Sequence, residues 1–479
     1  MSRSKTLRTS KNALMLLAGT MTRMVASFAF VLYSANLLSV EGFGKLAIAT
    51  HFFELFLSLT ATAIGILLTR DVARWPRHLS SLLTSATIMV FVLCCVAPLV
   101  MIPLGIGFRY SDDTIRAIGV SCIGLFPAAI CVLLEAIFVA RERAEFVTFG
   151  TAVESLLRIA LSVLVLRLGY GIIELMWVLV VSRTGLLIAY WFSLRQIATP
   201  SIQFSMRTTR RFLFRWRVFA AENWMATIYT NLDVLVLSWV AGEVAVGLYS
   251  AAWKFVRLGS VVAKSFTTAV FPVMSRMYID SKDSFHRLFQ HTVRVMCAIA
   301  LPAVIGVSVL TDRIVAILYK EEFAEAGPIL RVLIWVLLLE FLNPFLSHVL
   351  FAQGKQHRSM VVAAISLSVN SMATYLLVRQ FGAIGAAAGC ILGGLVATIC
   401  YLAFSAKMSE LPGIVASMAR VLVAASGMGV AVYLVRDSSW PIVIIVAAAV
   451  YVALLFLVQA VRMSDVRFFK STFLSRAPA

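Results

Sequence analysis

Long apolar stretches separated by short polar connections recur along the whole chain. A helix that crosses the hydrocarbon core of a bilayer needs about 20 mostly apolar residues. Fourteen stretches qualify, with expected bounds near 13–38, 44–69, 82–104, 115–139, 146–167, 172–193, 219–240, 246–274, 293–311, 328–351, 359–380, 383–405, 418–435 and 441–461. The pattern predicts an all-α polytopic membrane protein with about fourteen transmembrane helices.

The composition supports this prediction and excludes most soluble classes. Hydrophobic residues make up 61% of the 479 positions and charged residues only 14%, and the mean hydropathy is +0.93. Soluble domains average about 45–50% apolar and ~25% charged residues. A soluble multidomain enzyme, a disordered chain and a disulfide scaffold are therefore disfavoured.

The positive charge is distributed unevenly between the two sides of the predicted membrane. Of the 42 Lys and Arg residues, 27 fall in the segments that are cytoplasmic if both termini are inside, and nine fall on the other side or at its edges. Cytoplasmic loops of membrane proteins favour Lys and Arg. We therefore predict that both termini are cytoplasmic, and the net charge of +19 needs no nucleic-acid partner. The first apolar run lacks a signal-cleavage pattern, so we expect it to be retained.

An internal repeat relates the first six spans to the next six. Three pairs of segments match at offsets of 203 to 213 residues: 44–49 with 247–252, 138–141 with 351–355, and the predicted turn at Gly169 and Gly171 with that at Gly382 and Gly385. A shift of six spans preserves orientation, as in parallel-repeat transporters. We therefore expect a six-helix bundle at 1–193, a linker at 194–218, a second six-helix bundle at 219–405, and two further helices with a cytoplasmic tail at 406–479.

The linker at 194–218 carries six arginines. It suits a helix that lies on anionic lipid headgroups, but a merely solvated basic connection fits the sequence equally well.

Several cations lie where charge is costly. An ionisable side chain in the hydrocarbon core normally faces a partner or a water-filled cavity, and so is a candidate functional residue. Arg23 lies near the middle of the first span, and Lys254, Arg257 and Lys264 follow one face of the eighth. An extended row favours a cation-lined cavity over a single static pair. Such a cavity would suit an anion such as a diphosphate.

Acidic residues also fall inside the predicted spans. Glu54 lies near the middle of the second span, and Glu222 and Asp233 lie on nearly the same face of the seventh. They could be static partners of the cations or sites for ion coupling. Glu154 and Arg158, four residues apart, are expected to satisfy each other, and the position of Glu340 leaves both readings open.

The sequence lacks two common motifs of nucleotide-binding proteins and metalloenzymes. There is no G-x-x-x-x-G-K-[ST] phosphate loop and no H-E-x-x-H metal motif. The longest predicted outside loop, near 312–327, is too short for a catalytic domain. We expect no bound cofactor and no metal, and we expect a transporter rather than an enzyme.

Four short segments resemble the Wzx-like flippase family of polysaccharide biosynthesis. They are residues 12–14 with 39–44, residues 246–252, residues 317–326 and residues 352–355. Lys320 stands where the family usually has glycine. This family belongs to the multidrug/oligosaccharidyl-lipid/polysaccharide exporter superfamily.

The resemblance implies two six-helix bundles around a cavity lined largely by spans 1, 2, 7 and 8. It implies translocation of a polyprenyl-diphosphate-linked oligosaccharide across the bacterial inner membrane, for O-antigen, exopolysaccharide or capsule assembly. Membrane lipids, a polymerase and glycosyltransferases of the same pathway are the implied partners.

The resemblance implies one role for the buried cations and another for the buried acids. Arg23, Lys254, Arg257 and Lys264 would bind the diphosphate. Glu54, Glu222 and Asp233 would be counter-charges, or would couple transport to a proton or sodium gradient.

Other functions remain open at this point. A lipid II flippase or a drug–cation exporter of the same superfamily is the first alternative, although a drug–cation exporter should have a net acidic cavity. An integral-membrane glycosyltransferase or polymerase is a second, and a scaffold for an assembly complex is a third.

Overall fold

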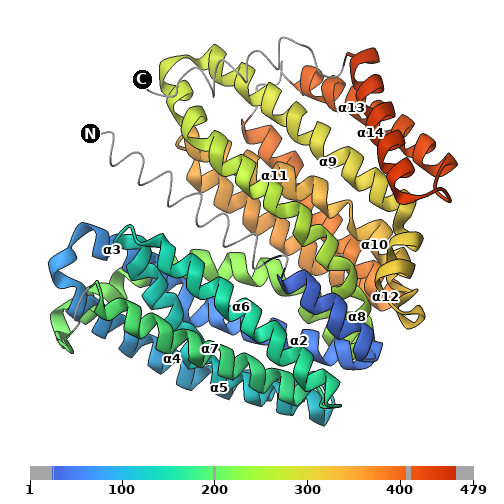
Figure 1. Cartoon of the computed structure of the whole chain (residues 1–479). Coiled ribbons are helices and arrows are strands. Elements are labelled where there is room, and N and C mark those ends of the chain that lie inside the picture. The colour runs from blue at the N-terminus through green and yellow to red at the C-terminus, as the bar shows by residue number, and fades with distance from the viewer. Residues whose placement is uncertain (1–23, 25, 198–200, 406–410, 460–479) are drawn as a thin grey trace. The chain divides into compact units, whose positions relative to one another are not determined.

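The computed structural model describes residues 24, 26–197, 201–405 and 411–459, and Figure 1 shows the path of the chain. Within these residues every regular element is a helix. Eleven helices of the described chain are long and apolar enough to cross a membrane, so the predicted all-α polytopic class is confirmed.

The helices follow one another with short connections. Their bounds are Val40–Leu57 (α2), Ala63–Arg74 (α3), Leu79–Gly107 (α4), Asp112–Ala140 (α5), Ala144–Arg167 (α6), Ile172–Arg195 (α7), Met206–Asp280 (α8), Lys282–Leu318 (α9), Ala326–Leu333 (α10), Val336–Ala352 (α11), Gln356–Ser405 (α12), Leu411–Leu434 (α13) and Trp440–Leu457 (α14). A shorter apolar helix, Ala26–Leu37, precedes α2. A π-helical turn, Ser58–Thr62 (η1), joins α2 to α3, and two 3₁₀ turns, Pro76–His78 (η2) and Glu321–Phe323 (η3), precede α4 and α10.

Two helices are far longer than a bilayer requires, and each has a break in its interior. The backbone of α8 leaves helical geometry at Gly242, with φ 79°, and that of α12 does so at Gly382, with φ 54°. Both positive φ values suit glycine. The breaks fall in the connections expected between the seventh and eighth spans and between the eleventh and twelfth. The total of fourteen spans and the orientation of the chain stay predictions.

The chain divides into two compact units, Met1–Ser250 and Ala251–Ala479. In the first unit, α5 packs extensively against α7, α4, α2 and α3, and α6 packs on α7. Figure 1 shows α4, α5 and α7 running side by side. Helix α5 is therefore the centre of this unit. The bundle boundaries expected at 193 and 219 stay predictions.

In the second unit, α9 packs against α10, α11 and α13, and α11 packs against α12. The two halves of α12 fold back on each other through small residues. A Cβ atom added to Gly389 would lie 2.2 Å from Thr374 Oγ1, and one added to Gly393 would lie 2.6 Å from Asn370 Cβ. Gly385 was expected in the turn, but it lies in the helix and packs against Leu377. Only Gly382 makes the turn.

The glycines that open the two repeated segments lie against each other. A Cβ atom added to Gly44 of α2 would lie 1.9 Å from the carbonyl oxygen of Glu243, and one added to Gly247 of α8 would lie 2.5 Å from that of Val40. Backbone therefore approaches backbone, a contact that membrane helices make through small residues. This close approach explains why both segments carry glycine at these two positions.

We predict that Gly44→Ala lowers the thermal unfolding midpoint of the purified protein. The added methyl group must push backbone apart, and overpacking of this kind costs about 1–3 kcal/mol. Gly119→Ala in α5 is the matched control because nothing lies within 4 Å of its added Cβ. Equal midpoints for the two variants would contradict the close approach.

Candidate functional site

The predicted cationic face of the eighth span lies on the second half of α8. Lys254 and Arg257 are partly buried, and Lys264 is exposed. Gly259 lies between them along the chain, and an added Cβ there would meet Leu337 of α11 at 2.6 Å. The cation-bearing half of α8 therefore packs closely on α11.

Glu340 of α11 is an acid that interacts with two of these cations within the second unit. It lies three residues after Leu337 and is partly buried. Both Lys264 and Arg257 interact electrostatically with its carboxylate. Sequence reasoning left its role open, because nothing in the pattern fixes how α11 is rotated against α8. The structure adds Glu340 to the residues that the sequence predicted for the site.

Asp233 has a defined local partner. The residue is 3% exposed, and its carboxylate accepts a hydrogen bond of 2.5 Å from the Tyr249 hydroxyl. The two residues lie on either side of the break at Gly242, so the bond ties the two halves of α8 together. The phenol donor was not recognised from the sequence. The role of Asp233 in counter-charge or ion coupling stays a proposal.

Glu54 belongs to a charged group in the first unit. It lies on the exposed side of α2 and acts electrostatically on Arg158 of α6. The expected pair between Glu154 and Arg158 is confirmed, with 3.8 Å between Glu154 Oε1 and Arg158 Nε. Arg183 of α7 approaches the same oxygen at 3.9 Å.

Two predicted site residues cannot be placed. Arg23 lies outside the described residues, and so does the side chain of Glu222. Their assignment to the site stays a prediction.

A row of side chains on the first half of α8, which we call the seam, faces α2, η1 and α3. Its members are spaced four residues apart: Arg215, Phe219, Asn223, Thr227 and Asn231. Their partners run the opposite way along the chain: Asp71 for Arg215, Arg70 for Phe219, Ser58 for Asn223 and Thr227, and His51 for Asn231. The first half of α8 thus runs antiparallel to α2 and α3.

The π-helical turn η1 lies at the middle of the seam. A π-turn interrupts the regular helical hydrogen-bond pattern and often marks a functional position. The indole Nε1 of Trp224 donates to the Leu59 carbonyl at 2.9 Å, and the Ser58 and Thr227 hydroxyls are 2.8 Å apart. Side chains of α8 therefore bind one backbone carbonyl and one side-chain hydroxyl of this turn. The hydropathy pattern does not predict this turn.

A third polar cluster surrounds Glu243, next to the break in α8. Its carboxylate accepts hydrogen bonds from the Ser111 backbone N–H at 3.0 Å and the Thr114 hydroxyl at 2.6 Å, and Lys45 Nζ lies 3.9 Å away. Beside it, burial raises the pKa of the Tyr110 phenol above its usual range. Tyr110 therefore remains protonated and available for its 2.6 Å bond with Ser238.

These features define a polytopic α-helical membrane protein whose spans carry interacting charges. Two family models match the chain. The model for "Polysaccharide biosynthesis protein" matches residues 9–278, and that for "Lipid II flippase MurJ" matches residues 235–454. The chain belongs to the polysaccharide biosynthesis protein family, as its sequence motifs predicted.

Three curated relatives illustrate the similarity. "Probable low-salt glycan biosynthesis flippase Agl15" of Haloferax volcanii is 21% identical over 45% of this chain and 46% of its own length. "Capsular polysaccharide biosynthesis protein CapF" of Staphylococcus aureus is 25% identical over 38% of this chain and 46% of its own length. "Lipopolysaccharide biosynthesis protein WzxC" of Escherichia coli is 24% identical over 43% of this chain and 42% of its own length. The matched part of the chain spans about half the length of these relatives.

Solved structures share the fold. A structure of lipid II flippase MurJ in an inward closed conformation matches with a TM-score of 0.75 and 15% identity, covering 97% of this chain and 100% of that one. An inward-facing multidrug resistance MATE family transporter of the MOP superfamily matches with a TM-score of 0.68 and 16% identity, covering 82% of this chain and 95% of that one. The chain therefore shares the fold of these two proteins.

We predict that Glu154→Ala strongly lowers the thermal unfolding midpoint. It leaves Arg158 and Arg183 without their shared carboxylate, and breaking a buried charge pair costs about 3–5 kcal/mol. Glu145→Ala on the same helix is the control, because the Arg143–Glu145 pair is exposed and such pairs contribute at most about 1 kcal/mol. A midpoint for Glu154→Ala no lower than that of the control would contradict the account.

A second prediction concerns the seam. In a cysteine-free background, Ser58→Cys with Thr227→Cys should form a disulfide on mild oxidation, because the two hydroxyls are already 2.8 Å apart and a disulfide needs closely spaced Cβ atoms. Ser58→Cys with Thr230→Cys is the control, since Thr230 is exposed. The readout is the gel mobility of a protein cleaved between α2 and α8. If only the Ser58/Thr230 cysteine pair cross-linked, the contacts assigned to the seam would be wrong.

Proposed function

We propose that the protein flips a polyprenyl-diphosphate-linked oligosaccharide across the bacterial inner membrane for the assembly of a surface glycan. Membership in the polysaccharide biosynthesis protein family supports this proposal. The observation that carries it is the row of cations on α8, which lies inside an apolar helix where charge is retained only for a partner or a passing ligand.

The cationic face supplies the chemistry for the diphosphate. Arg257 and Lys254 would form charge-assisted hydrogen bonds with its oxygens, and Lys264 and Arg23 would extend the positive surface. Glu340 would hold Arg257 and Lys264 between substrate molecules, since it already interacts with both. A doubly charged ligand would compete with this single carboxylate for the two cations.

Transport would proceed by alternating access, with rocking of helical bundles about a central site. Glu54, Glu222 and Asp233 are the candidates for coupling to a proton or sodium gradient. Removal of the product on the far side by a polymerase or glycosyltransferase of the same pathway could instead set the direction.

The second candidate is a flippase for a carrier lipid similar to lipid II. The match of residues 235–454 to the MurJ model favours it, and the cationic face would serve either diphosphate. A drug–cation exporter fits a cationic face poorly. The two flippase candidates differ in the sugars carried, so the identity of the lipid that accumulates in a deletion strain separates them.

We predict that Arg257→Ala and Lys254→Ala reduce surface-glycan display about tenfold or more, while lipid-linked oligosaccharide accumulates on the cytoplasmic side. The loss of a charge-assisted hydrogen bond of about 1.5–3 kcal/mol corresponds to at least that factor. The measurement is the surface glycan and the extracted carrier lipid, at matched levels of protein in the membrane.

Arg276→Ala is the matched control because Arg276 lies on the same helix but is exposed near its end. Arg257→Lys should retain part of the activity, since it keeps the charge and loses the guanidinium fork. Normal display in both alanine variants would count against the cationic face as the substrate site.

A further inference from the structure

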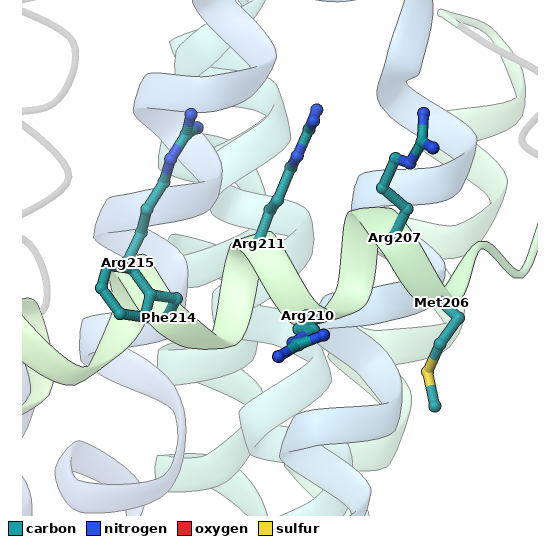
Figure 2. A pocket seen from close by; sticks show the side chains of 6 residues that line it. All are labelled: Met206, Arg207, Arg210, Arg211, Phe214 and Arg215. Atoms are coloured by element: carbon teal, nitrogen blue, oxygen red, sulfur yellow. The ribbon is translucent and has the colours of Figure 1, made fainter.

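A second cluster of cations lies at the start of α8, far along the chain from the face around Arg257. Residues Met206, Arg207, Arg210, Arg211, Phe214 and Arg215 line a pocket of about 550 Å³. Figure 2 shows Arg207, Arg211 and Arg215 extending side by side from one face of the helix. At 1.5 Å per residue, the outer two of this row are about 12 Å apart along the axis.

This arginine helix packs against other helices of the first unit. Phe212 is 2% exposed, and the Thr209 hydroxyl lies 2.9 Å from that of Ser85 in α4. Arg215 pairs with the buried carboxylate of Asp71 at 3.3 Å. The sequence left open whether this stretch is a solvated linker, and these contacts favour a helix held in place.

The charge of the helix is not balanced locally. Five arginines and no acidic residue occur from Met206 to Ala221. In the described part of the chain no carboxylate pairs with Arg207, Arg210 or Arg211, and the single pair in the row is that of Arg215 with Asp71. The guanidinium groups of Arg207 and Arg211, which no described carboxylate pairs with, suit phosphate oxygens, which accept bidentate hydrogen bonds.

Large apolar side chains are exposed around the same pocket. Met206 is 72% exposed and Phe214 is 67% exposed, and Ile202 and Phe204, just before the helix, are also exposed. A binding site for a free phosphate ion has no need of such a rim. Apolar side chains next to arginines are typical of a helix that lies where headgroups meet acyl chains.

The position of the pocket agrees with a location where lipid headgroups meet acyl chains. Asp71 lies in the last turn of α3, shortly before the exposed turn at Trp75 to His78. Upstream of the arginine helix, the Gln203 backbone N–H donates to Thr84 near the start of α4. The pocket therefore lies beside the ends of two membrane helices, and Trp75 is the kind of residue that marks a membrane interface.

We propose that this pocket binds the phosphate headgroup of an anionic membrane phospholipid. Arg207 and Arg211 would donate to the phosphate oxygens, Arg210 would add to the local positive charge, and Met206 and Phe214 would contact the acyl chains. Arg215 fixes the helix through Asp71. This site is separate from the flippase proposal and does not depend on it.

The test measures lipid binding to the purified full-length protein in a neutral detergent. Short-chain phosphatidylglycerol should bind saturably and raise the thermal midpoint, whereas short-chain phosphatidylcholine should bind far more weakly. Arg207→Gln with Arg211→Gln should weaken phosphatidylglycerol binding about tenfold or more. Added salt should weaken binding to the wild type.

The matched control is Arg276→Gln with Arg287→Gln, which removes two exposed arginines elsewhere and should bind as the wild type does. Glycerol 3-phosphate distinguishes the source of the phosphate. If it binds as tightly as phosphatidylglycerol, the pocket is a site for free phosphate and the proposal is wrong. Equal binding of the two phospholipids, or an unaffected Arg207/Arg211 double variant with a normal melting curve, also overturns it.

Discussion

The hydrocarbon core of a bilayer offers no water to a charge or to a free backbone group, so each polar group there must find a partner in the protein or face a cavity. This constraint accounts for the internal arrangement of the chain. Glu154 is shared by two arginines, Asp233 is held by a phenol, and the Leu59 carbonyl in η1 accepts a hydrogen bond from Trp224. Where a cation row is extended, as on α8, the same constraint favours a ligand.

Helix α8 carries three groups of polar residues, one after another along the chain. Its arginine helix lies beside the ends of α3 and α4, its seam follows α2 and α3, and its last part presents Lys254, Arg257 and Lys264 beside α11. The break at Gly242 separates the seam from the cationic part. A single helix thus joins the proposed lipid contact to the proposed substrate contact, with the non-helical Gly242 between the seam and the cationic face.

Much of the fold could be predicted because hydropathy and glycine placement are local signals. Apolar length predicted the spans, and the breaks at Gly242 and Gly382 fall in the expected connections. The pair of Glu154 and Arg158 was also predictable, since their spacing places both on one helix face. Contacts between helices were not predictable in this way. The approach of Glu340 to Lys264 depends on how α11 is rotated and packed against α8, which a single sequence does not specify.

The central claim is that the cationic face of α8 carries the diphosphate of a lipid-linked oligosaccharide through the membrane. The most direct measurement is flipping in vesicles containing only the purified protein and a fluorescent polyprenyl-diphosphate oligosaccharide, followed by quenching of the label in the accessible leaflet. The account predicts transfer of the label by the wild type and by Arg276→Ala, and little transfer by Arg257→Ala. Equal transfer by Arg257→Ala and the wild type would contradict it.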